Sequence, residues 1–177
     1  MLGKVKFEIE PANKKSDIGI VRGLAWTSVG GDTLEIEVNS MPGKADMILT
    51  GQMGDVMQES ARIALTYVRS IVSKKPYNVD VEFFENNCIH LHIPEGAVPK
   101  DGPSAGVTMA TAILSAVAQI PVKADIAMTG EINLRGKVLP IGGLKEKLLA
   151  AKSAGIKTVL VPIKNKSDVE EFDKEIT

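Results

Sequence analysis

The chain has 177 residues, 44 % of them hydrophobic, and a formal net charge of −1 at pH 7. This length suffices for a substantial core, so we expect a single domain over residues 1–177. The near-neutral charge and an aromatic content of 4 % argue against a nucleic-acid partner, which needs a basic stripe or stacking residues. No run approaches the ~20 apolar residues that span a bilayer. The lone cysteine, Cys88, suits a reducing compartment.

The first half of the chain predicts strands around a hairpin, followed by one long helix. Two β-like runs, at 18–27 and 33–38, lie on either side of Gly30-Gly31-Asp32, a turn sequence that predicts a hairpin. In its second strand Glu35 and Glu37 alternate with apolar residues, which predicts a solvated face rather than a catalytic carboxylate pair. The expected elements are a strand and an exposed turn within residues 1–17, strands at 18–27, 33–38 and 47–51, a helix at 54–73, and strands at 79–84 and 89–93.

The second half alternates helices with short strands. The expected elements are a buried helix at 104–118, a strand at 125–130, a short strand pair within 133–139, a helix from Gly142, a buried strand at 158–162 and a short helix at 167–172. Taken together, the hairpins and β-α-β passages predict an α/β sandwich with a mixed β-sheet and packed helices.

Ser104 stands where a loop rich in proline and glycine becomes the first of these helices. The first amides of a helix have no intrahelical partner and point beyond its start. Ser104 therefore has two interpretations. It is either an ordinary helix-capping serine, or a nucleophile whose loop, with Gly102, Pro103 and Ala105, supplies amides that stabilise an oxyanion.

The helix after Gly142 has one lysine on its apolar side. At about 100° per residue, Lys147 falls between alanines, whereas Lys145 faces water. Lys147 either extends its amine past the alanines to solvent, or holds it in a dry pocket. In a dry pocket, desolvation and the positive end of the helix would both lower the lysine pKa. A neutral amine is a general base for a hydroxyl such as that of Ser104.

Two further patterns imitate functional sites. Cys88, His90 and His92 share one strand face, but the chain has no other histidine or cysteine to complete a usual zinc set. The stretch Gly130–Val138 resembles a phosphate-binding loop, but it has one residue too many between the glycines and a valine where Ser or Thr binds magnesium. We therefore expect neither a metal nor a nucleotide in this domain.

Three motifs in the present order closely resemble the proteolytic domain of Lon, the ATP-dependent protease. They are PKDGPSAG at 99–106, MTGE at 128–131 and GGLKEKLLAA at 142–151. Residues 51–60 and 23–26 resemble the same domain, so the likeness covers nearly the whole chain. The resemblance implies the architecture that Lon shares with the ribosomal-protein and GHMP-kinase superfamily, and we expect an archaeal-type member.

The resemblance also implies roles for particular residues. In the family, the serine of PSAG is the nucleophile and the second lysine of KEK is the base, which gives Ser104 and Lys147. Thr129 would hydrogen-bond the lysine amine and orient it, although it could instead cap local backbone. Asp101 approaches the lysine in some archaeal-type members and holds a resting form. Such a pair would raise the lysine pKa and oppose activation.

The family context implies partners that this chain does not encode. Lon proteins carry an AAA+ ATPase module, which uses ATP and Mg to unfold substrates and feed them to the protease. Neither its phosphate loop nor the length for it is present, so we expect a domain cut from a longer protein at an artificial Met1. We expect no cofactor in this domain, unfolded or misfolded polypeptides as substrates, a hexameric ring and a role in protein quality control. The longer protein is expected in the cytoplasm, tethered to the membrane in some archaeal-type members.

Two other classes of function stay open. A glycine-rich loop at a helix start is also an anion site, and GHMP-type kinases share the broader superfamily, so a phosphate- or nucleotide-binding domain is one alternative. The other is a catalytically silent assembly module whose loop is locked by Asp101.

Overall fold

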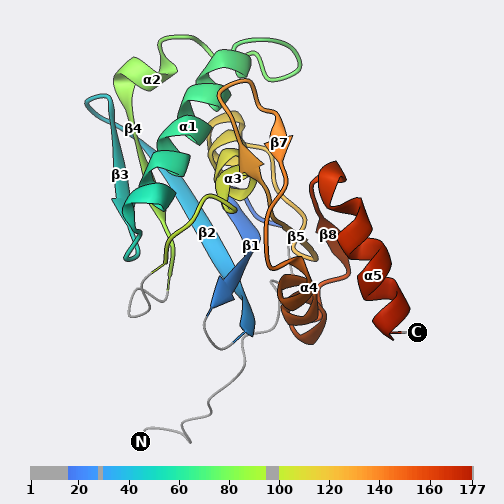
Figure 1. The fold of residues 1–177 in the computed structure, drawn as a ribbon. Helices are drawn as coiled ribbons and strands as arrows, with labels where there is room; N and C mark the ends of the chain where they lie inside the picture. Colours follow the sequence, from blue (N-terminus) through green and yellow to red (C-terminus); the bar gives the residue numbers. More distant parts are fainter. Residues whose placement is uncertain (1–15, 28–29, 95–99, 177) are drawn as a thin grey trace, which may run out of the picture.

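A six-stranded mixed sheet in the order β3-β4-β2-β1-β5-β8 forms the centre of the fold (Figure 1). The computed structural model describes residues 16–27, 30–94 and 100–176, so the first predicted strand lies outside the described residues. The strands of the sheet are β1 (Ile20–Thr27), β2 (Gly30–Pro42), β3 (Asp46–Thr50), β4 (Asn87–His92), β5 (Ile126–Met128) and β8 (Thr158–Leu160). Strand β2 is antiparallel to β1 and β4, whereas the pairs β1/β5, β3/β4 and β5/β8 are parallel. The predicted mixed sheet and the pairing of the first two strands as a hairpin are confirmed. The predicted turn at Gly30-Gly31-Asp32 is wrong, because these residues belong to β2 and Gly31 is the register partner of Trp26.

Helices pack on both faces of this sheet, and a small separate hairpin lies beside them. The helices are α1 (Asp55–Ile71), α2 (Phe83–Asn86), α3 (Gly106–Ala118), α4 (Leu144–Ser153) and α5 (Lys166–Ile176), with a 3-10 turn η1 (Ile163–Asn165). The hairpin consists of β6 (Glu131–Ile132) and β7 (Val138–Leu139). The predicted α/β sandwich is therefore the observed architecture.

Side chains three apart on a strand point to opposite faces, and β1 shows which helix covers which face. Val21 of β1 belongs to the main core, which α1 and α3 complete. Leu24 packs instead with Ala127 and with Ala151 of α4. Helices α3 and α4 therefore approach the sheet from opposite sides (Figure 1). The segments that carry Ser104 and Lys147 can meet only where the sheet between them ends.

Helix α3 packs tightly on β1 at Gly23, which has no side chain. A Cβ at Gly23 of β1 would lie 3.2 Å from Leu34 and 3.3 Å from Thr108 of α3, which is tighter than ordinary packing. The Thr108 hydroxyl donates to the carbonyl of Met128 at 3.2 Å and ties the helix to β5. Most residues of α3 are buried, as the sequence predicted.

The strand expected at 79–84 is wrong. The Asp80 carboxylate accepts a hydrogen bond from the Glu82 N–H at 2.9 Å, and its carbonyl accepts one from the Phe83 N–H at 3.0 Å. These bonds form a turn that leads into α2, and they leave Val81 72 % exposed. Aspartate favours such turns because its side chain bonds to backbone amides two residues on. Here that local preference overrides the alternating apolar pattern.

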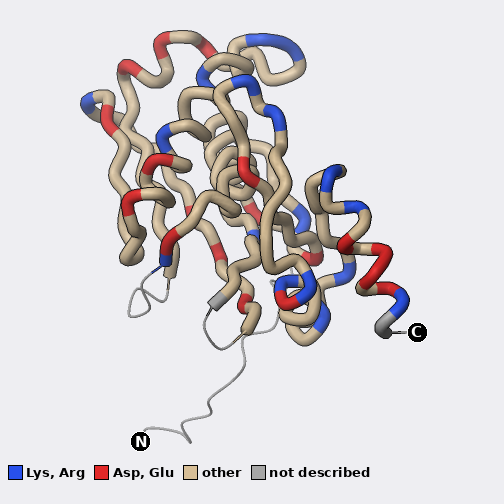
Figure 2. The backbone as a smooth tube through the Cα atoms, in the orientation of Figure 1, with Lys and Arg blue, Asp and Glu red and all other residues tan. Residues whose placement is uncertain are grey.

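Two C-terminal expectations need correction. The last strand, β8, is an edge strand and not a buried one, since Leu160 is 51 % exposed and Thr158 is exposed. The helix predicted at 167–172 extends over Lys166–Ile176 as α5. Blue and red segments lie side by side in α4 and α5 (Figure 2), so basic and acidic residues mix there and do not form a stripe of one sign.

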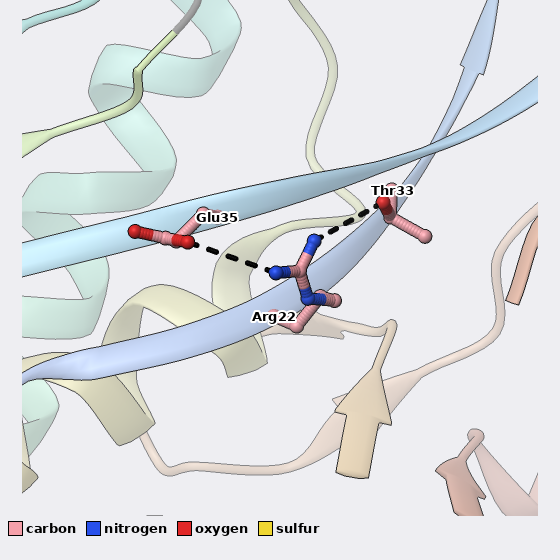
Figure 3. Close-up of polar contacts among 3 residues, drawn as sticks. All are labelled: Arg22, Thr33 and Glu35. Carbon is pink, nitrogen blue, oxygen red and sulfur yellow. Dashed lines mark hydrogen bonds and ion pairs between the residues drawn. The ribbon is translucent and has the colours of Figure 1, made fainter. Parts of the chain in front are cut away.

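The face of the hairpin opposite α3 holds a partly buried ion pair. Arg22 and Glu35 are register partners, and the guanidinium Nη2 lies 3.6 Å from the carboxylate Oε2 (Figure 3). Arg22 Nη1 also donates to the hydroxyl of Thr33 at 3.3 Å. Glu35 is thus half-buried and paired, not simply solvated as the alternation predicted.

We predict that Gly136→Ala destabilises the protein more than Gly155→Ala. Both glycines have a left-handed backbone, with φ of 78° and 77°, so each substitution carries a similar conformational cost of about 1–2 kcal/mol. A Cβ at Gly136 would also overlap the ring of Tyr67 on α1, whereas nothing lies near Gly155. The expected difference in unfolding free energy is about 1–3 kcal/mol, measured by urea denaturation. Equal losses of unfolding free energy in the two variants would show that the Tyr67 ring moves aside without an energetic cost.

Candidate active site

Ser104 lies in the turn that precedes α3, not inside the helix. Helix α3 begins at Gly106, two residues after the serine, and its N-cap is Ala105, which makes no side-chain cap. The Ser104 hydroxyl has no hydrogen-bond partner among the residues that the structure describes, and the residue is half-buried. The helix-capping interpretation of Ser104 is therefore not realised.

The end of β5 holds the backbone of this serine. The Ser104 carbonyl accepts a hydrogen bond from the Gly130 N–H at 2.8 Å and a longer one from the Thr129 hydroxyl at 3.4 Å. The Gly130 carbonyl in turn accepts from the Val107 N–H of α3 at 3.0 Å. These bonds fix the downstream side of the loop against the MTGE motif.

Lys147 of α4 is buried, with only 2 % of its surface exposed. Its Nζ donates to the Thr129 hydroxyl at 3.4 Å, and no carboxylate among the described residues forms an ion pair with it. The alternative in which the amine reaches solvent is therefore excluded. Burial lowers the pKa of Lys147 below the ordinary lysine value of 10.5, because desolvation penalises the ammonium form.

Thr129 is the residue that brings the two segments together. Its hydroxyl accepts from Lys147 and can donate to the Ser104 carbonyl, and its side chain is buried. A hydroxyl can fill both roles because it has one hydrogen and two lone pairs. Ser104 and Lys147, which the sequence paired, thus contact the same threonine from opposite sides of the sheet.

The start of α4 depends on close contacts with neighbouring segments. Gly143, the N-cap of α4, has a φ of 65°, and a Cβ there would lie 3.1 Å from the indole of Trp26. Trp26 is nonetheless 61 % exposed, so it lies on the surface beside the helix start. A glycine is needed at position 143 both for the backbone and for this approach.

Asn165 is a residue that the sequence analysis missed. It is 3 % exposed, and its amide oxygen accepts from the Ile141 N–H at 2.9 Å. Its amide nitrogen donates to the Ile141 carbonyl at 2.9 Å and to Asp168 at 2.7 Å. These bonds hold the linker that leads into α4 and so help to place Lys147. An asparagine just before a helix carries no local signal of such a long-range clamp.

Asp101 does not contact Lys147. Its Oδ1 accepts hydrogen bonds from the N–H of Met57 in α1 at 2.9 Å and from the N–H of Gly102 at 2.8 Å. The pairing with lysine that would mark a resting form is absent from the described contacts of either side chain.

Some backbone N–H groups near Ser104 already donate a hydrogen bond, and others have no acceptor among the described residues. Pro103 has no N–H, and the Gly102 N–H is taken by Asp101. The first two amides of α3 donate to backbone carbonyls. Within the described part of the chain, the N–H groups of Ser104 and Ala105 have no acceptor.

The two patterns that imitate other sites take ordinary structural roles. His90 Nε2 and His92 Nδ1 lie 2.9 and 2.6 Å from the hydroxyl of Thr50 on the neighbouring strand. The described residues contain no group of three or more His, Cys, Asp or Glu that could hold a metal. The stretch 130–138 forms the β6–β7 hairpin. No helix in the described ranges has the length and apolar character to cross a membrane.

Comparison with known proteins gives one consistent family. The model of the Lon protease (S16) C-terminal proteolytic domain matches residues 1–177. The Lon protease of Lachnoclostridium phytofermentans is 65 % identical over 176 residues, which are 99 % of this chain and 22 % of that protein. The Lon proteases of Clostridioides difficile and Vibrio parahaemolyticus are 56 % and 58 % identical over 175 residues, again 99 % of this chain and 22 % of theirs.

The chain therefore spans less than a quarter of the length of these relatives. They are bacterial proteins, so they lend no support to the expected archaeal type. Because the family model covers every residue, and because the serine, lysine and threonine motifs meet around one buried hydroxyl, this chain belongs to the Lon protease (S16) C-terminal proteolytic domain family, a family of peptidases.

Proposed function

We propose that this chain is a serine endopeptidase in which Ser104 is the nucleophile and Lys147 the general base. The observation that carries the proposal is the buried Lys147 amine, whose one described partner is the Thr129 hydroxyl that also contacts the Ser104 segment. A lysine buried without a carboxylate is costly to keep charged, so its neutral form is favoured.

A neutral amine suits the base of such a dyad. It has two hydrogens and one lone pair, and a hydrogen bond to Thr129 uses only one hydrogen. The lone pair then accepts the proton of the Ser104 hydroxyl as its oxygen attacks the peptide carbonyl. Thr129 is a positioning residue in this scheme, because it fixes the direction of the amine and does not touch the substrate.

The proposed reaction has two steps, formation of an ester on Ser104 and hydrolysis of that ester. The Ser104 oxygen bonds to the carbonyl carbon, Lys147 takes the proton, and the tetrahedral intermediate carries an oxyanion. Lys147 then gives its proton to the leaving amine as the peptide bond breaks, which leaves an ester. Water hydrolyses that ester with Lys147 again acting as base, and Ser104 recovers its hydrogen.

The available N–H groups of Ser104 and Ala105 are the groups we assign to the oxyanion. Neither has a protein acceptor among the described residues, whereas the Gly102 N–H is already engaged. In other serine enzymes the loss of one such donor lowers the rate about 100- to 1,000-fold. The paired first amides of α3 also weaken the phosphate-binding alternative, since that alternative needs those amides for the anion.

We further propose that the domain works as the peptidase part of a larger ATP-dependent protease. In support, relatives named Lon protease are several times longer than this chain. A linked AAA+ module would use ATP and Mg to deliver unfolded polypeptides to a hexameric ring, for protein quality control. The peptidase chemistry itself would need no cofactor. The lone Cys88 suits a cytoplasmic location of this larger protease.

We predict that Ser104→Ala abolishes cleavage of an unstructured fluorogenic peptide without unfolding the chain. A serine-directed phosphonate should label Ser104 of the parent, and mass spectrometry of the digest should locate the label. Ser73→Ala, which alters an exposed serine after α1, is the control and should retain cleavage and labelling. Turnover that survives in Ser104→Ala, or a label on another residue, would refute the nucleophile.

We predict that peptide cleavage by the parent rises with pH through the lowered pKa of Lys147, because only the neutral amine accepts a proton. Lys147→Met should lower kcat about 100- to 10,000-fold above the lowered pKa, which is the usual contribution of a general base, and the difference should shrink below that pKa, where the lysine of the parent is protonated. Lys152→Met, an exposed substitution on the same helix, should keep the parent profile. A pH-independent rate in the parent would contradict the assignment.

We also predict that Lys147→Met is more stable than the parent at pH 7. Below the ordinary pKa of 10.5 the lysine of the unfolded chain is protonated. In the folded chain, burial destabilises the protonated form, so the folded state binds this proton less tightly. Parent stability therefore rises with pH between the lowered pKa and 10.5, whereas the methionine variant gains nothing from this group. Urea midpoints from pH 7 to 10 should converge. A constant gap would mean that the amine stays hydrated.

A further inference from the structure

The loop that carries Ser104 is tied to the start of α1 through its upstream residues. The Lys100 N–H donates to the Gln52 carbonyl at 3.0 Å, and the Lys100 carbonyl accepts from the Gly54 N–H at 2.7 Å. One residue later, Asp101 Oδ1 accepts from the Met57 N–H at 2.9 Å. The motif that contains Ser104 thus docks on the start of α1 through a contact between Asp101 and Met57, which are 44 residues apart in the chain.

Asp101 serves as the N-terminal cap that α1 lacks locally. The N-cap of α1 is Gly54, which has no side chain, and the first amides of a helix need acceptors from outside it. Met57 is the third residue of α1, the position that a capping carboxylate normally reaches. A negative charge at this positive end of the helix is also favourable.

The absence of a side chain at Gly54 leaves room for the Asp101 carboxylate. A Cβ at position 54 would overlap the carboxyl group of Asp101 and lie 2.8 Å from its Cβ. The glycine backbone is ordinary, with φ of −72° and ψ of 174°, so conformation does not require a glycine here. The three atoms nearest to such a Cβ all belong to Asp101, so a side chain at position 54 would first displace the Asp101 carboxylate.

Between Asp101 and Ser104 the loop has few other restraints. Gly102 has a φ of 111°, and its side-chain position is open to space. Asp101 also accepts the Gly102 N–H, so one carboxylate oxygen shapes the turn and binds it to α1. Downstream, the Ser104 carbonyl is held by Gly130. The serine therefore lies between anchors on both sides, and Asp101, which follows the backbone bonds of Lys100, is the nearest of them upstream.

We propose that Asp101 is a positioning residue that holds the Ser104 loop in its reactive geometry by capping α1 and does so without contact with Lys147. This inference rests on the proposed role of Ser104 as nucleophile. The constraint is transmitted through backbone between Asp101 and the serine. Loss of it misplaces the hydroxyl, and misplacement of about 1 Å can lower a rate about 100-fold.

The first test replaces the carboxylate. Asp101→Ala should lower kcat for peptide cleavage, and the rate of phosphonate labelling, about 10- to 100-fold, with KM changed less than about threefold. Asp101→Asn keeps an oxygen acceptor for both amides and should recover most of the rate. Asp55→Asn removes the same charge from the first turn of α1 without touching the loop and should match the parent.

The second test leaves the loop sequence intact. Gly54→Ala should displace the Asp101 carboxylate and lower kcat and labelling as Asp101→Ala does. The double variant should be no worse than Asp101→Ala alone, because both changes break one contact. Additive losses, an unchanged rate in Gly54→Ala, or a rate in Asp101→Ala at or above the parent would each overturn the proposal.

A readout without chemistry separates this inference from the proposed function. The Gly106 N–H, which donates to Pro103 at 3.2 Å, reports on the order of the loop beyond Ser104. Its hydrogen exchange should quicken in Asp101→Ala and in Gly54→Ala, and stay unchanged in Asp55→Asn. If the parent is never labelled at Ser104, the proposed nucleophile fails. Unchanged exchange of Gly106 in both variants would reject the anchor, whatever the activity.

Discussion

The burial of one amine is the constraint on which the site depends. Lys147 lies inside the fold with a hydroxyl as its described partner, and desolvation lowers its pKa. A buried ammonium without a counter-charge is among the most costly groups that a protein can hold, so the position of Lys147 in the fold shifts its equilibrium towards the uncharged form. The reactivity that we propose for this lysine is thus a consequence of where α4 packs, and it needs no neighbouring acid to set it.

The sheet explains how two distant motifs reach one threonine. Helices α3 and α4 cover opposite faces, and β5 ends after Met128 between them. Thr129 follows directly after the end of β5, where it contacts Lys147 on one side and the Ser104 carbonyl on the other. The small Gly23 lets α3 approach the sheet closely enough for this arrangement.

Much of this fold could be predicted from periodic patterns in the sequence. Single contacts between distant segments could not be predicted in this way. Helical spacing identified the buried side of Lys147, because it is set by residues near in sequence. The β1–β2 hairpin was also predicted, but its turn was misplaced, since Gly30-Gly31-Asp32 continue β2 and pair with β1. The strand expected at 79–84 failed where the turn at Asp80 outweighed alternation. Asn165, whose clamp on the α4 linker depends on a residue 24 positions away, gave no local signal at all.

Asp101 shows why the position of one carboxylate decides the electrostatics of the whole site. Paired with Lys147, it would raise the lysine pKa and favour the ammonium, which is unable to accept a proton. Bound to Met57 and Gly102 instead, it satisfies amides at the positive end of α1 and leaves the lysine with no described counter-ion. Its Oδ1 is already committed to these two amides. The contact that anchors the Ser104 loop is therefore also the contact that keeps this charge away from the proposed base.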